Sequence, residues 1–563
     1  MLELELRQKS YADAAVRAEE LLRDHADELM ESGQGLISVG TWLDALLGHD
    51  RPAFAALAAE YERQFGPAAR QALLALRGGQ AVGRRPDEFY TIARRFRLSS
   101  VAAEALAAAG DRAAELGDVY SAHAYYTLAG RDGWTPTGAA AERAQGIYRL
   151  ATGAARAGYV GPVPCPAKWY AMPEGFASPK YLPYLAGDTL YLASGESAVA
   201  LREDGAPVWS FQLPRAVVVE GMPVHPMATG RGPLLAPAVL TDASGAAQIL
   251  VVRQFGAREW CLRGLRASDG KVLWTSDSDA GAVRLSYCST PVVAGRYVYA
   301  VGVDSSPSGA MGAPEVVLAA LDVMSGKLLW RAGLGRITEP PAVHGRIDPR
   351  GIRAEDFWNQ GPVALEGDAV YLTPNVGHAM AVGAFDGKLR WVQPYEEKTD
   401  ARQSRLTHST AQVFRWKNTP AVLERRIVSA PQDTSLVVAF DRENGQGSFG
   451  REEIGKTVVG RVGGAAILAG ADAVTAVDAD LTTRWSYLPP EGTTIIGPPV
   501  VIGSNVYVPT SGGTLVFGGE DGMAGKPEVK LPDVKAVVTS AAAKGALGAD
   551  VANSFMVGDG RRK

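Results

Sequence analysis

Two long stretches, residues 335–360 and 396–420, collect the side chains of this chain that are best suited to binding another molecule. Each combines an indole ring, an imidazole and charged groups, namely His344, Asp356, Trp358, Arg405, His408 and Trp416. Trp and Arg are enriched among the residues that contribute most to binding at protein interfaces, and long loops on a rigid fold commonly carry recognition. We therefore predict that the two stretches together form a binding surface.

Other interpretations of these residues stay open. Trp358 and Trp416 can instead fasten their loops to the fold, or they can stack on the sugar rings of a carbohydrate. His344 and His408 would need a carboxylate close by to hold a metal ion, and no short ligand spacing suggests one. The chain also lacks the G-x-S-x-G pattern of serine hydrolases and the H-E-x-x-H pattern of zinc proteases. We predict no metal and no catalytic residues.

A short repeat indicates the elements that position these loops. An apolar strand is followed by a polar turn and then by an aromatic residue, six times at intervals of 36 to 65 residues. The clear copies contain Asp269, Gly270 and Trp274, then Asp322, Gly326 and Trp330, then Asp386, Gly387 and Trp391, and looser copies end at Trp209, Phe449 and Trp485. Gly allows the positive φ of a tight hairpin, and Asp accepts hydrogen bonds from the amides of the turn. Each copy therefore predicts two antiparallel strands.

A second repeat precedes most of these turns and predicts another pair of strands. It consists of two short apolar segments separated by a turn that contains Gly, and it occurs at 185–191, 293–299, 365–371 and 501–507. Two hairpins make one four-stranded blade, and repeats of this length are typical of a radial stack of small sheets. We predict a propeller of about seven blades, with eight as the alternative. The aromatic residues would fill the widening space between blades, so they would be structural and not reactive.

The first 157 residues predict a different class of structure. They are rich in Ala, and their apolar residues recur three and four positions apart, which is typical of amphipathic helices. One helix would end at Gly117, and Asp118 would cap the next, while small residues such as Gly110 would let the two helices pack closely. This pair resembles a tetratricopeptide hairpin, and an ordinary helical bundle is the alternative.

The predicted fold class is therefore α+β with more than one domain. An all-α helical-repeat domain (1–157) would be joined by a Gly- and Pro-rich linker (158–166) to an all-β propeller (167–525), and a flexible tail (526–563) would follow. A chain of 563 residues exceeds what a single hydrophobic core usually serves.

Charge and hydropathy exclude several classes of partner. The net charge is −4 and 21% of the residues are charged, so the sequence shows no basic surface for nucleic acid or anionic lipid. No run of 18 apolar residues predicts a transmembrane helix. Residues 1–6 lack a basic region followed by an apolar stretch, so no secretory signal is visible and a cytoplasmic location is an alternative.

The three cysteines, Cys165, Cys261 and Cys288, form no C-x-x-C pattern and no adjacent pair. We interpret them as buried apolar side chains. A disulfide between Cys261 and Cys288, in neighbouring blades, is the alternative.

The D-x-x-S-G-K-x-x-W turn at 322–330 resembles the PQQ-like (pyrroloquinoline-quinone-like) propeller repeat, and the resemblance extends over 167–525. This repeat occurs in quinoprotein dehydrogenases and in the lipoprotein subunit of the outer-membrane β-barrel assembly machine. The segment 94–125 resembles the helical region that precedes such propellers in many uncharacterised, mostly planctomycete proteins, which are commonly exported. The resemblance implies a propeller and a location in the periplasm or cell envelope.

The resemblance also raises an enzymatic alternative. Quinoprotein dehydrogenases, as a family, stack the quinone on a Trp, often cover it with a disulfide between adjacent cysteines, and hold Ca²⁺ with Glu, Asn and Asp oxygens. This chain has no adjacent cysteines and no oxygen set whose spacing marks a calcium site. We therefore expect neither PQQ nor Ca²⁺, and we predict a non-catalytic scaffold that binds another protein. The propeller would offer a platform and the helices a groove.

Overall fold

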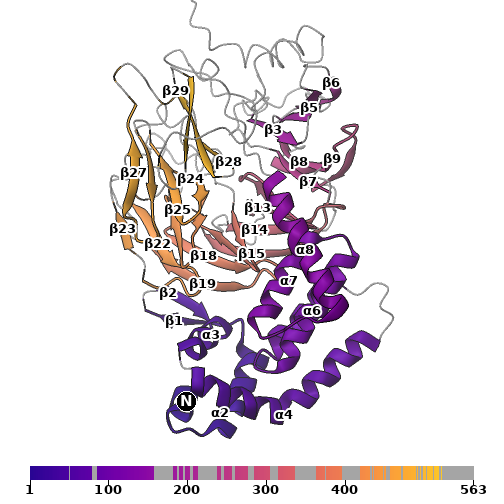
Figure 1. The fold of residues 1–563 in the computed structure, drawn as a ribbon, viewed down its shortest axis with the longest axis vertical. Coiled ribbons are helices and arrows are strands. Elements are labelled where there is room, and N and C mark those ends of the chain that lie inside the picture. The colour runs from indigo at the N-terminus through magenta and orange to yellow at the C-terminus, as the bar shows by residue number, and fades with distance from the viewer. Residues whose placement is uncertain are drawn as a thin grey trace, which may run out of the picture.

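The computed structural model describes residues 1–157, apart from 34, 50 and 79–84, and the range 182–522 with gaps, the longest of which are 213–236, 277–284, 305–314, 337–362 and 396–418. Helices come first along the chain and antiparallel sheets follow, as predicted. Figure 1 shows the helices gathered at one end of the molecule, against the sheets. The predicted linker (158–166) and tail (526–563) lie outside the described residues.

The helical region contains short and long helices packed around their own cores. They are α1 (Leu2–Arg7), α2 (Tyr11–Glu20), a π-helical turn η1 (Leu21–His25), α3 (Val39–His49), α4 (Arg51–Gly78), α5 (Pro86–Arg95), α6 (Ser100–Glu115), α7 (Val119–Arg131) and α8 (Gly138–Ala157). One core gathers α1–α3 with the first half of α4, and a second core gathers the second half of α4 with α5–α7 and extends into the sheets.

The predicted helical hairpin is α6 with α7, and its ends follow the sequence. Gly117 adopts φ +74° after α6, and the Asp118 carboxylate accepts a hydrogen bond of 3.0 Å from the Ser121 amide at the start of α7. A Cβ at Gly110 would lie 2.7 Å from the Tyr126 ring, so only glycine permits this approach of the two helices. The hairpin is confirmed, and its tetratricopeptide character stays a prediction.

The expectation of an all-α N-terminal domain is wrong at one place. Residues 29–38 form a β-hairpin, β1 (Leu29–Ser32) and β2 (Gly35–Ser38), between η1 and α3. Gly33 supplies the turn with φ +64°. The hairpin is short, and an isolated pair of strands is marginal in water, so it depends on pairing with a distant strand that the local sequence does not reveal.

The strands of the described residues form seven antiparallel sheets, each built mostly from strands consecutive in the chain. Their bounds are β3 (Leu182–Ala186), β4 (Thr189–Ala193), β5 (Ser197–Arg202) and β6 (Pro207–Gln212); β7 (Ala238–Thr241), β8 (Ala247–Phe255), β9 (Trp260–Arg266) and β10 (Val272–Thr275); β11 (Leu285–Tyr287), β12 (Val292–Ala294), β13 (Tyr297–Asp304), β14 (Glu315–Asp322) and β15 (Leu328–Arg336); β16 (Ala364–Glu366), β17 (Ala369–Leu372), β18 (His378–Gly383) and β19 (Leu389–Pro394); β20 (Ala421–Val422), β21 (Arg426–Ser429), β22 (Val437–Asp441) and β23 (Phe449–Arg451); β24 (Thr457–Val462), β25 (Ala465–Ala469), β26 (Val474–Val477) and β27 (Thr483–Tyr487); β28 (Val500–Ile502), β29 (Asn505–Thr510) and β30 (Gly513–Gly518). The blade count of the whole ring stays a prediction.

The repeated Trp of one sheet lies on the turn of the next sheet. Nε1 of Trp209, Trp274, Trp330 and Trp391 donates to the carbonyl oxygens of Ala267, Val323, Ala384 and Arg442, at 2.7, 2.8, 3.2 and 3.2 Å. Each ring covers a turn glycine with φ between +69° and +72°, where a Cβ would come within 2.4–2.6 Å of the ring: Gly270, Gly326, Gly387 and Gly445. We call this arrangement the Trp–Gly contact. It fixes the spacing of neighbouring sheets by one hydrogen bond and one close approach.

The turns themselves are closed by the predicted carboxylates. Asp269 accepts from the Lys271 amide at 3.0 Å, and Asp386 accepts from the Lys388 amide at 3.1 Å. Asp322, placed four residues before its glycine, accepts from the amides of Met324 and Ser325 at 3.1 and 3.0 Å. Asp therefore stands either directly before the turn glycine or four residues before it, and in both positions its carboxylate accepts hydrogen bonds from the backbone amides of the turn.

Candidate functional site

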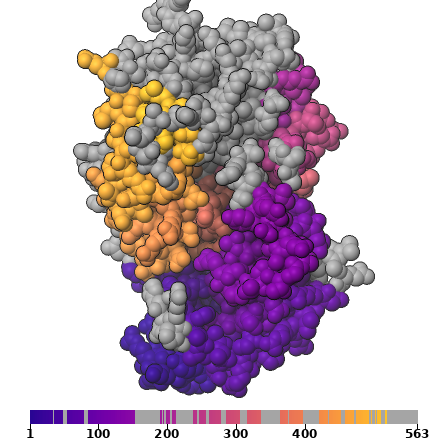
Figure 2. Space-filling view, in the orientation of Figure 1, coloured from indigo at the N-terminus to yellow at the C-terminus, as the bar shows by residue number. Residues whose placement is uncertain are grey.

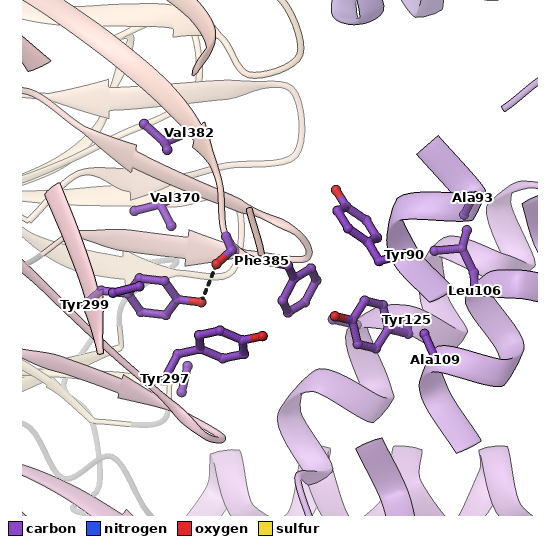
Figure 3. Close-up of a cluster of buried hydrophobic side chains, with 14 of the residues drawn as sticks. Tyr90, Ala93, Leu106, Ala109, Tyr125, Tyr297, Tyr299, Val370, Val382 and Phe385 are labelled. Carbon is purple, nitrogen blue, oxygen red and sulfur yellow. Dashed lines mark hydrogen bonds between the residues drawn. The ribbon is translucent and has the colours of Figure 1, made fainter. Parts of the chain in front are cut away.

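The helical region and two of the sheets share one hydrophobic cluster, which we call the junction. Phe385, in the turn after β18, has its ring centroid 5.4 Å from that of Tyr90 on α5 and 4.4 Å from that of Tyr125 on α7. Tyr297 of β13 lies 5.8 Å from the same ring, and Figure 3 shows Phe385 projecting among these three tyrosines. Aromatic pairs at such distances stabilise beyond the area they bury, so the two parts are joined by a core and not by a linker alone.

The tyrosines of the junction are neutral, and the Tyr125 hydroxyl is buried without a hydrogen-bond partner. Burial raises the pKa values of Tyr90, Tyr125 and Tyr297. The Tyr299 hydroxyl donates to the Ala384 carbonyl oxygen at 3.0 Å, which ties β13 to the turn that carries Phe385. The ring packing and this hydrogen bond position β13, α5 and α7 against the turn.

A partly buried ion pair borders the aromatic cluster. Arg390 of β19 donates to the Asp368 carboxylate at 3.1 Å and to the Asp368 carbonyl oxygen at 2.8 Å. The Tyr90 hydroxyl donates to the same carboxylate at 3.0 Å. Burial favours the neutral form of Asp368, but the Arg390 guanidinium outweighs it and lowers the pKa of Asp368 to about 2. The carboxylate therefore stays ionised and holds α5 to the turn between β16 and β17.

A second set of charges lies beside the hairpin. Arg94 of α5 bridges two carboxylates, Asp386 at 2.5 Å and Asp27 at 2.7 Å. Lys388 lies 3.2 Å from the other oxygen of Asp27. Because Asp27 precedes β1 and Asp386 follows β18, Arg94 joins three separate segments of the chain.

The Asp118 side chain, which caps α7, also contacts the sheet that contains β13. The Asp118 carboxylate that caps α7 also accepts a hydrogen bond of 3.2 Å from the Arg296 amide. Gly295, with φ +56°, allows this approach, since a Cβ there would lie 1.9 Å from the carboxylate. The turn between β12 and β13 therefore sits on the start of α7.

The hairpin β1–β2 extends a blade sheet to six strands, in the order β1-β2-β19-β18-β17-β16. Ile37 pairs with Trp391 and Leu36 with Val392 in an antiparallel register, and Ile37 is buried against the Trp391 ring. Figure 1 shows β2 beside β19, and Figure 2 shows the helical region lying directly against the sheets. The helical region thus contributes strands as well as helices to the contact.

A hollow of about 200 Å³ opens at the edge of the junction. We call it the junction cleft, and it is lined by Arg85, Asp87, Tyr90, Thr91, Arg296, Tyr297, Leu329, Trp330, Phe385 and Asp386. Arg85 pairs with Asp87 at 2.7 Å, and Arg296 pairs with Asp322 at 2.9 Å. Nε of Arg296 is buried and has no hydrogen-bond acceptor.

A second hollow, of about 440 Å³, lies between α4 and α5. We call it the α4–α5 groove, and it is lined by Ala72, Ala75, Leu76, Glu88, Thr91 and Ile92. Thr91 belongs to both hollows, so they are neighbours along α5. The arrangement can accommodate a chain-like ligand with apolar groups.

The six side chains of the predicted binding surface, His344, Asp356, Trp358, Arg405, His408 and Trp416, lie outside the described residues. The surface therefore stays a prediction. The aromatic residues of the repeat are distributed between sheets: Trp209, Trp274, Trp330 and Trp391 make the Trp–Gly contact, Trp485 lies on Gly522, and Phe449 is half-buried at the edge of β23.

Cys261 and Cys288 are buried thiols with no disulfide between them, so the disulfide alternative is wrong. Their Sγ atoms donate to the carbonyl oxygens of Gln254 at 3.4 Å and Val301 at 3.3 Å. Cys165 lies outside the described residues. Within the part of the chain that the structure describes, no three His, Cys, Asp or Glu side chains are grouped to hold a metal ion, and no helix is long and apolar enough to span a bilayer.

One motif was missed at the sequence level. Residues 450–457 match the G-x-x-x-x-G-K-[ST] pattern of phosphate-binding loops. That pattern binds phosphate when a helix follows and its first amides point at the ligand. Thr457, the last residue of the match, begins the strand β24. Among the described residues the match is therefore followed by a strand and not by the helix that a phosphate site needs.

The family described as "Outer membrane protein assembly factor BamB" matches residues 167–309 and 314–522, more than half of the chain. The chain belongs to this PQQ-like propeller family. The predicted recognition is thereby confirmed, and the matched range covers all the sheets except the hairpin β1–β2.

Solved structures with similarity to this family member include proteins of more than one kind. BamB from Moraxella catarrhalis is 16% identical, over 63% of this chain and 87% of that one, with a TM-score of 0.37. The quinohemoprotein alcohol dehydrogenase ADHIIG from Pseudomonas putida HK5 is 11% identical, over 62% of this chain and 66% of that one, with a TM-score of 0.38. The quinohemoprotein alcohol dehydrogenase from Comamonas testosteroni is 14% identical, over 63% and 67%, with a TM-score of 0.35. A comparison with curated proteins finds no match.

The junction is the feature that sequence reasoning missed in this PQQ-like propeller. Phe385 and Tyr297 belong to the repeats, but the spacing of the repeats does not show which blades face the helices. The one usable signal is the group of basic residues in 94–97, at the end of an amphipathic helix. Such a group indicates carboxylates nearby, and it does not indicate which ones.

Proposed function

We propose that this protein is a non-catalytic scaffold that binds other proteins in a bacterial cell envelope. The observation that carries the proposal is the junction, where helices and blades share a hydrophobic core, a sheet and partly buried ion pairs. Domains joined by small polar contacts move relative to each other, whereas a large apolar interface holds them together. The surfaces of the two parts therefore keep a fixed spacing, which suits a protein that holds partners in place.

The charges of the junction support a structural use. Asp368, Arg390 and Arg94 each pair with a group on another segment of the chain. An ionised carboxylate that is already paired is a poor proton acceptor, because accepting a proton would break the pair. The description of the family as an assembly factor of the outer membrane supports the envelope as the location.

Photo-crosslinking in the native host tests the proposal. A benzophenone amino acid would replace one exposed residue at a time: Leu74 and Tyr148 on the helices, and Met324 and Leu488 on the sheets, which are 57–70% exposed. We expect light-dependent adducts with a defined protein from at least one position on each part. The unsubstituted protein, irradiated in parallel, is the control, and an envelope fraction should contain the adduct.

An enzymatic role would be recognised by a separate assay. Purified protein would be incubated with PQQ and Ca²⁺ and passed through gel filtration. Retained cofactor absorbance together with oxidation of an alcohol or a sugar would overturn the proposal.

The two loop stretches belong to the proposal as a second surface. Alanine at Trp358 or Trp416 should weaken crosslinking of the partner if these indoles contact it. A glycan-array signal that disappears with the same two substitutions would instead assign a carbohydrate ligand to the loops.

A further inference from the structure

The sheet that the β1–β2 hairpin extends ends in a strand with an open side, β1. Strand β2 lies between β19 and β1, so among the described residues β1 has a neighbouring strand on one side only. A bulge, a Pro or a charged side chain usually keeps such an edge from pairing with other strands. The register of β1 with β2 has no bulge, and β1 contains no Pro. Its one charge is Glu31, which repels an acidic strand and attracts a basic one.

Two residues of β1 direct their backbone groups toward the open side. In an antiparallel pair, residues that exchange hydrogen bonds with the neighbouring strand alternate with residues that do not. The Val39 amide donates to the Glu28 carbonyl oxygen at 2.9 Å, and the register continues from there without a shift. Positions 28, 30 and 32 are therefore the ones that bond to β2 and its extension. The N–H and C=O groups of Leu29 and Glu31 face away from β2.

The side chains of the same two residues lie on one face of the sheet, together with Leu36. The register pairs Leu36 with Glu31. Leu29 is 38% exposed and Leu36 39%, and Glu31 is exposed as well. Among the described residues, Glu31 takes part in no ion pair. Cross-strand pairs stabilise a sheet when apolar side chains meet or opposite charges meet, so this face suits a strand that offers one apolar and one basic side chain.

The segment that carries β1 is acidic. Residues 1–50 contain eleven Asp and Glu but four Lys and Arg, whereas the whole chain contains 61 and 57. Such an excess attracts basic partners and repels acidic ones. A second copy of this chain would bring the same acidic segment to the contact, so a different, basic partner fits the edge better than a second copy does.

We propose that β1 receives a basic strand of a partner protein, which adds to the sheet as its seventh strand. The added strand runs antiparallel to β1, as β2 does. Its Lys or Arg lies opposite Glu31 and, two residues later, an apolar residue lies opposite Leu29. The backbone supplies the hydrogen bonds and the two side chains select the sequence. The inference rests on the proposed function, and it specifies the surface and the chemistry of one partner.

The test uses the whole chain and a fluorescein-labelled heptapeptide, Ser-Thr-Lys-Thr-Val-Thr-Ser, in a fluorescence anisotropy titration. We expect binding. Methylation of the Lys and Val amide nitrogens should weaken it about tenfold, because two hydrogen bonds to β1 are lost. Methylation of the two Thr amides that follow Lys and Val is the matched control. Those amides face away from β1, so this peptide should bind like the unmethylated one.

Charge reversal on the protein tests the contribution of the side chains. Glu31→Lys should weaken binding of the Lys peptide about tenfold, because an attraction is replaced by a repulsion. The same variant should prefer a peptide in which Glu replaces Lys. Glu104→Lys is the control: Glu104 is exposed on α6, and its substitution changes the net charge equally. This variant should bind the Lys peptide like the unsubstituted chain.

Hydrogen exchange at single-residue resolution locates the added strand. The Lys peptide should slow exchange of the Leu29 and Glu31 amides, which face the open side. It should leave exchange of the Met30 and Ser32 amides unchanged, since these already bond to β2. Slower exchange at all four amides would mean that the peptide stabilises the hairpin without pairing with its edge, and it would overturn the inference.

Three further results would overturn the inference: no binding of the Lys peptide, equal losses from the two methylation patterns, or equal binding by Glu31→Lys and Glu104→Lys. If crosslinking in the host identifies a protein partner while the peptide does not bind, this inference fails and the proposed scaffold stands. If neither experiment finds a bound protein or peptide, both fail.

Discussion

The contacts between neighbouring blades and the contacts at the junction are built in opposite ways. Between blades, one arrangement recurs, a Trp ring on a turn glycine with a hydrogen bond from Nε1. At the junction each contact occurs once and joins distant parts of the chain, such as Tyr90 with Arg390. The first kind follows from a local pattern of residue types. The second depends on which surfaces the fold brings together.

One pair of sheets departs from the recurring contact, and the departure is informative. β23 begins with Phe449 in place of Trp, and the turn of the next sheet has Leu481, with φ +58°, at its positive-φ position. Leu481 is buried in the cluster against which Phe449 packs. Where no indole covers the turn, a side chain fits at the positive-φ position. The turn glycines of the other sheets are therefore needed for two reasons: they adopt a positive φ, and they leave room for the Trp ring.

The largest effect should come from filling one Trp–Gly contact. In Gly326→Ala the new Cβ would lie 2.4 Å from the Trp274 ring, at a φ of +70°. The left-handed backbone costs about 1–2 kcal/mol and the overpacking about 1–3 kcal/mol. We expect a loss of about 3 kcal/mol in the free energy of unfolding, measured by urea denaturation.

Gly367→Ala separates the two causes. Gly367 has a similar φ of +59°, but nothing lies within 4 Å of a Cβ there. It should lose about 1 kcal/mol, the backbone cost alone. Equal losses for the two variants would mean that the indole does not constrain the turn. The claim that the Trp–Gly contact determines how neighbouring blades pack would then be wrong.

A smaller effect is expected when the ion pair of the junction is broken. Arg390→Met leaves the Asp368 carboxylate buried without its cation, and we expect a loss of about 2 kcal/mol, below the range for fully buried pairs because Arg390 is partly exposed. Arg331→Met is the control: its partner, Asp304, lies in the same sheet, and the Arg331 side chain is 42% exposed. Pairs with an exposed cation contribute about 0–1 kcal/mol.

The same pair predicts a pH dependence with a definite sign. The pKa of Asp368 is about 2 in the folded chain, below its ordinary value of about 3.9. The pair therefore contributes its full stability above pH ~4 and loses it as the pH falls through about 2. In thermal unfolding between pH ~4 and ~2, the Tm of the unsubstituted chain should fall because of this pair, and the Tm of Arg390→Met should lack that contribution. If the Tm of both proteins depends on pH in the same way, the low pKa of Asp368 does not depend on Arg390.

The sequence and the structure agree where a residue pattern has a local cause. Asp and Gly at fixed spacing are sufficient for a hairpin turn, and Gly117 followed by Asp118 is sufficient to end one helix and begin the next. The second role of Asp118, as acceptor for the Arg296 amide, has no local cause, because Arg296 is 178 positions away. The cleft could not be predicted for the same reason: its walls come from α5 and from two sheets. The predicted loop surface involves residues outside the described part of the chain.

The smallest effect on overall stability is expected at the hairpin, where the helical region enters a blade sheet. A Cβ at Gly35 would lie 2.5 Å from the Val392 carbonyl oxygen, so Gly35→Ala should separate β2 from β19. Since the junction core and its ion pairs remain, we expect a loss of about 1 kcal/mol. Hydrogen exchange should rise in 29–38 and in 389–394. Gly33→Ala, which strains only the turn at φ +64° and has open space around its Cβ, should leave exchange in 389–394 unchanged. If Gly35→Ala also leaves exchange in 389–394 unchanged, the β1–β2 hairpin does not stabilise the sheet, and the core alone holds the junction together.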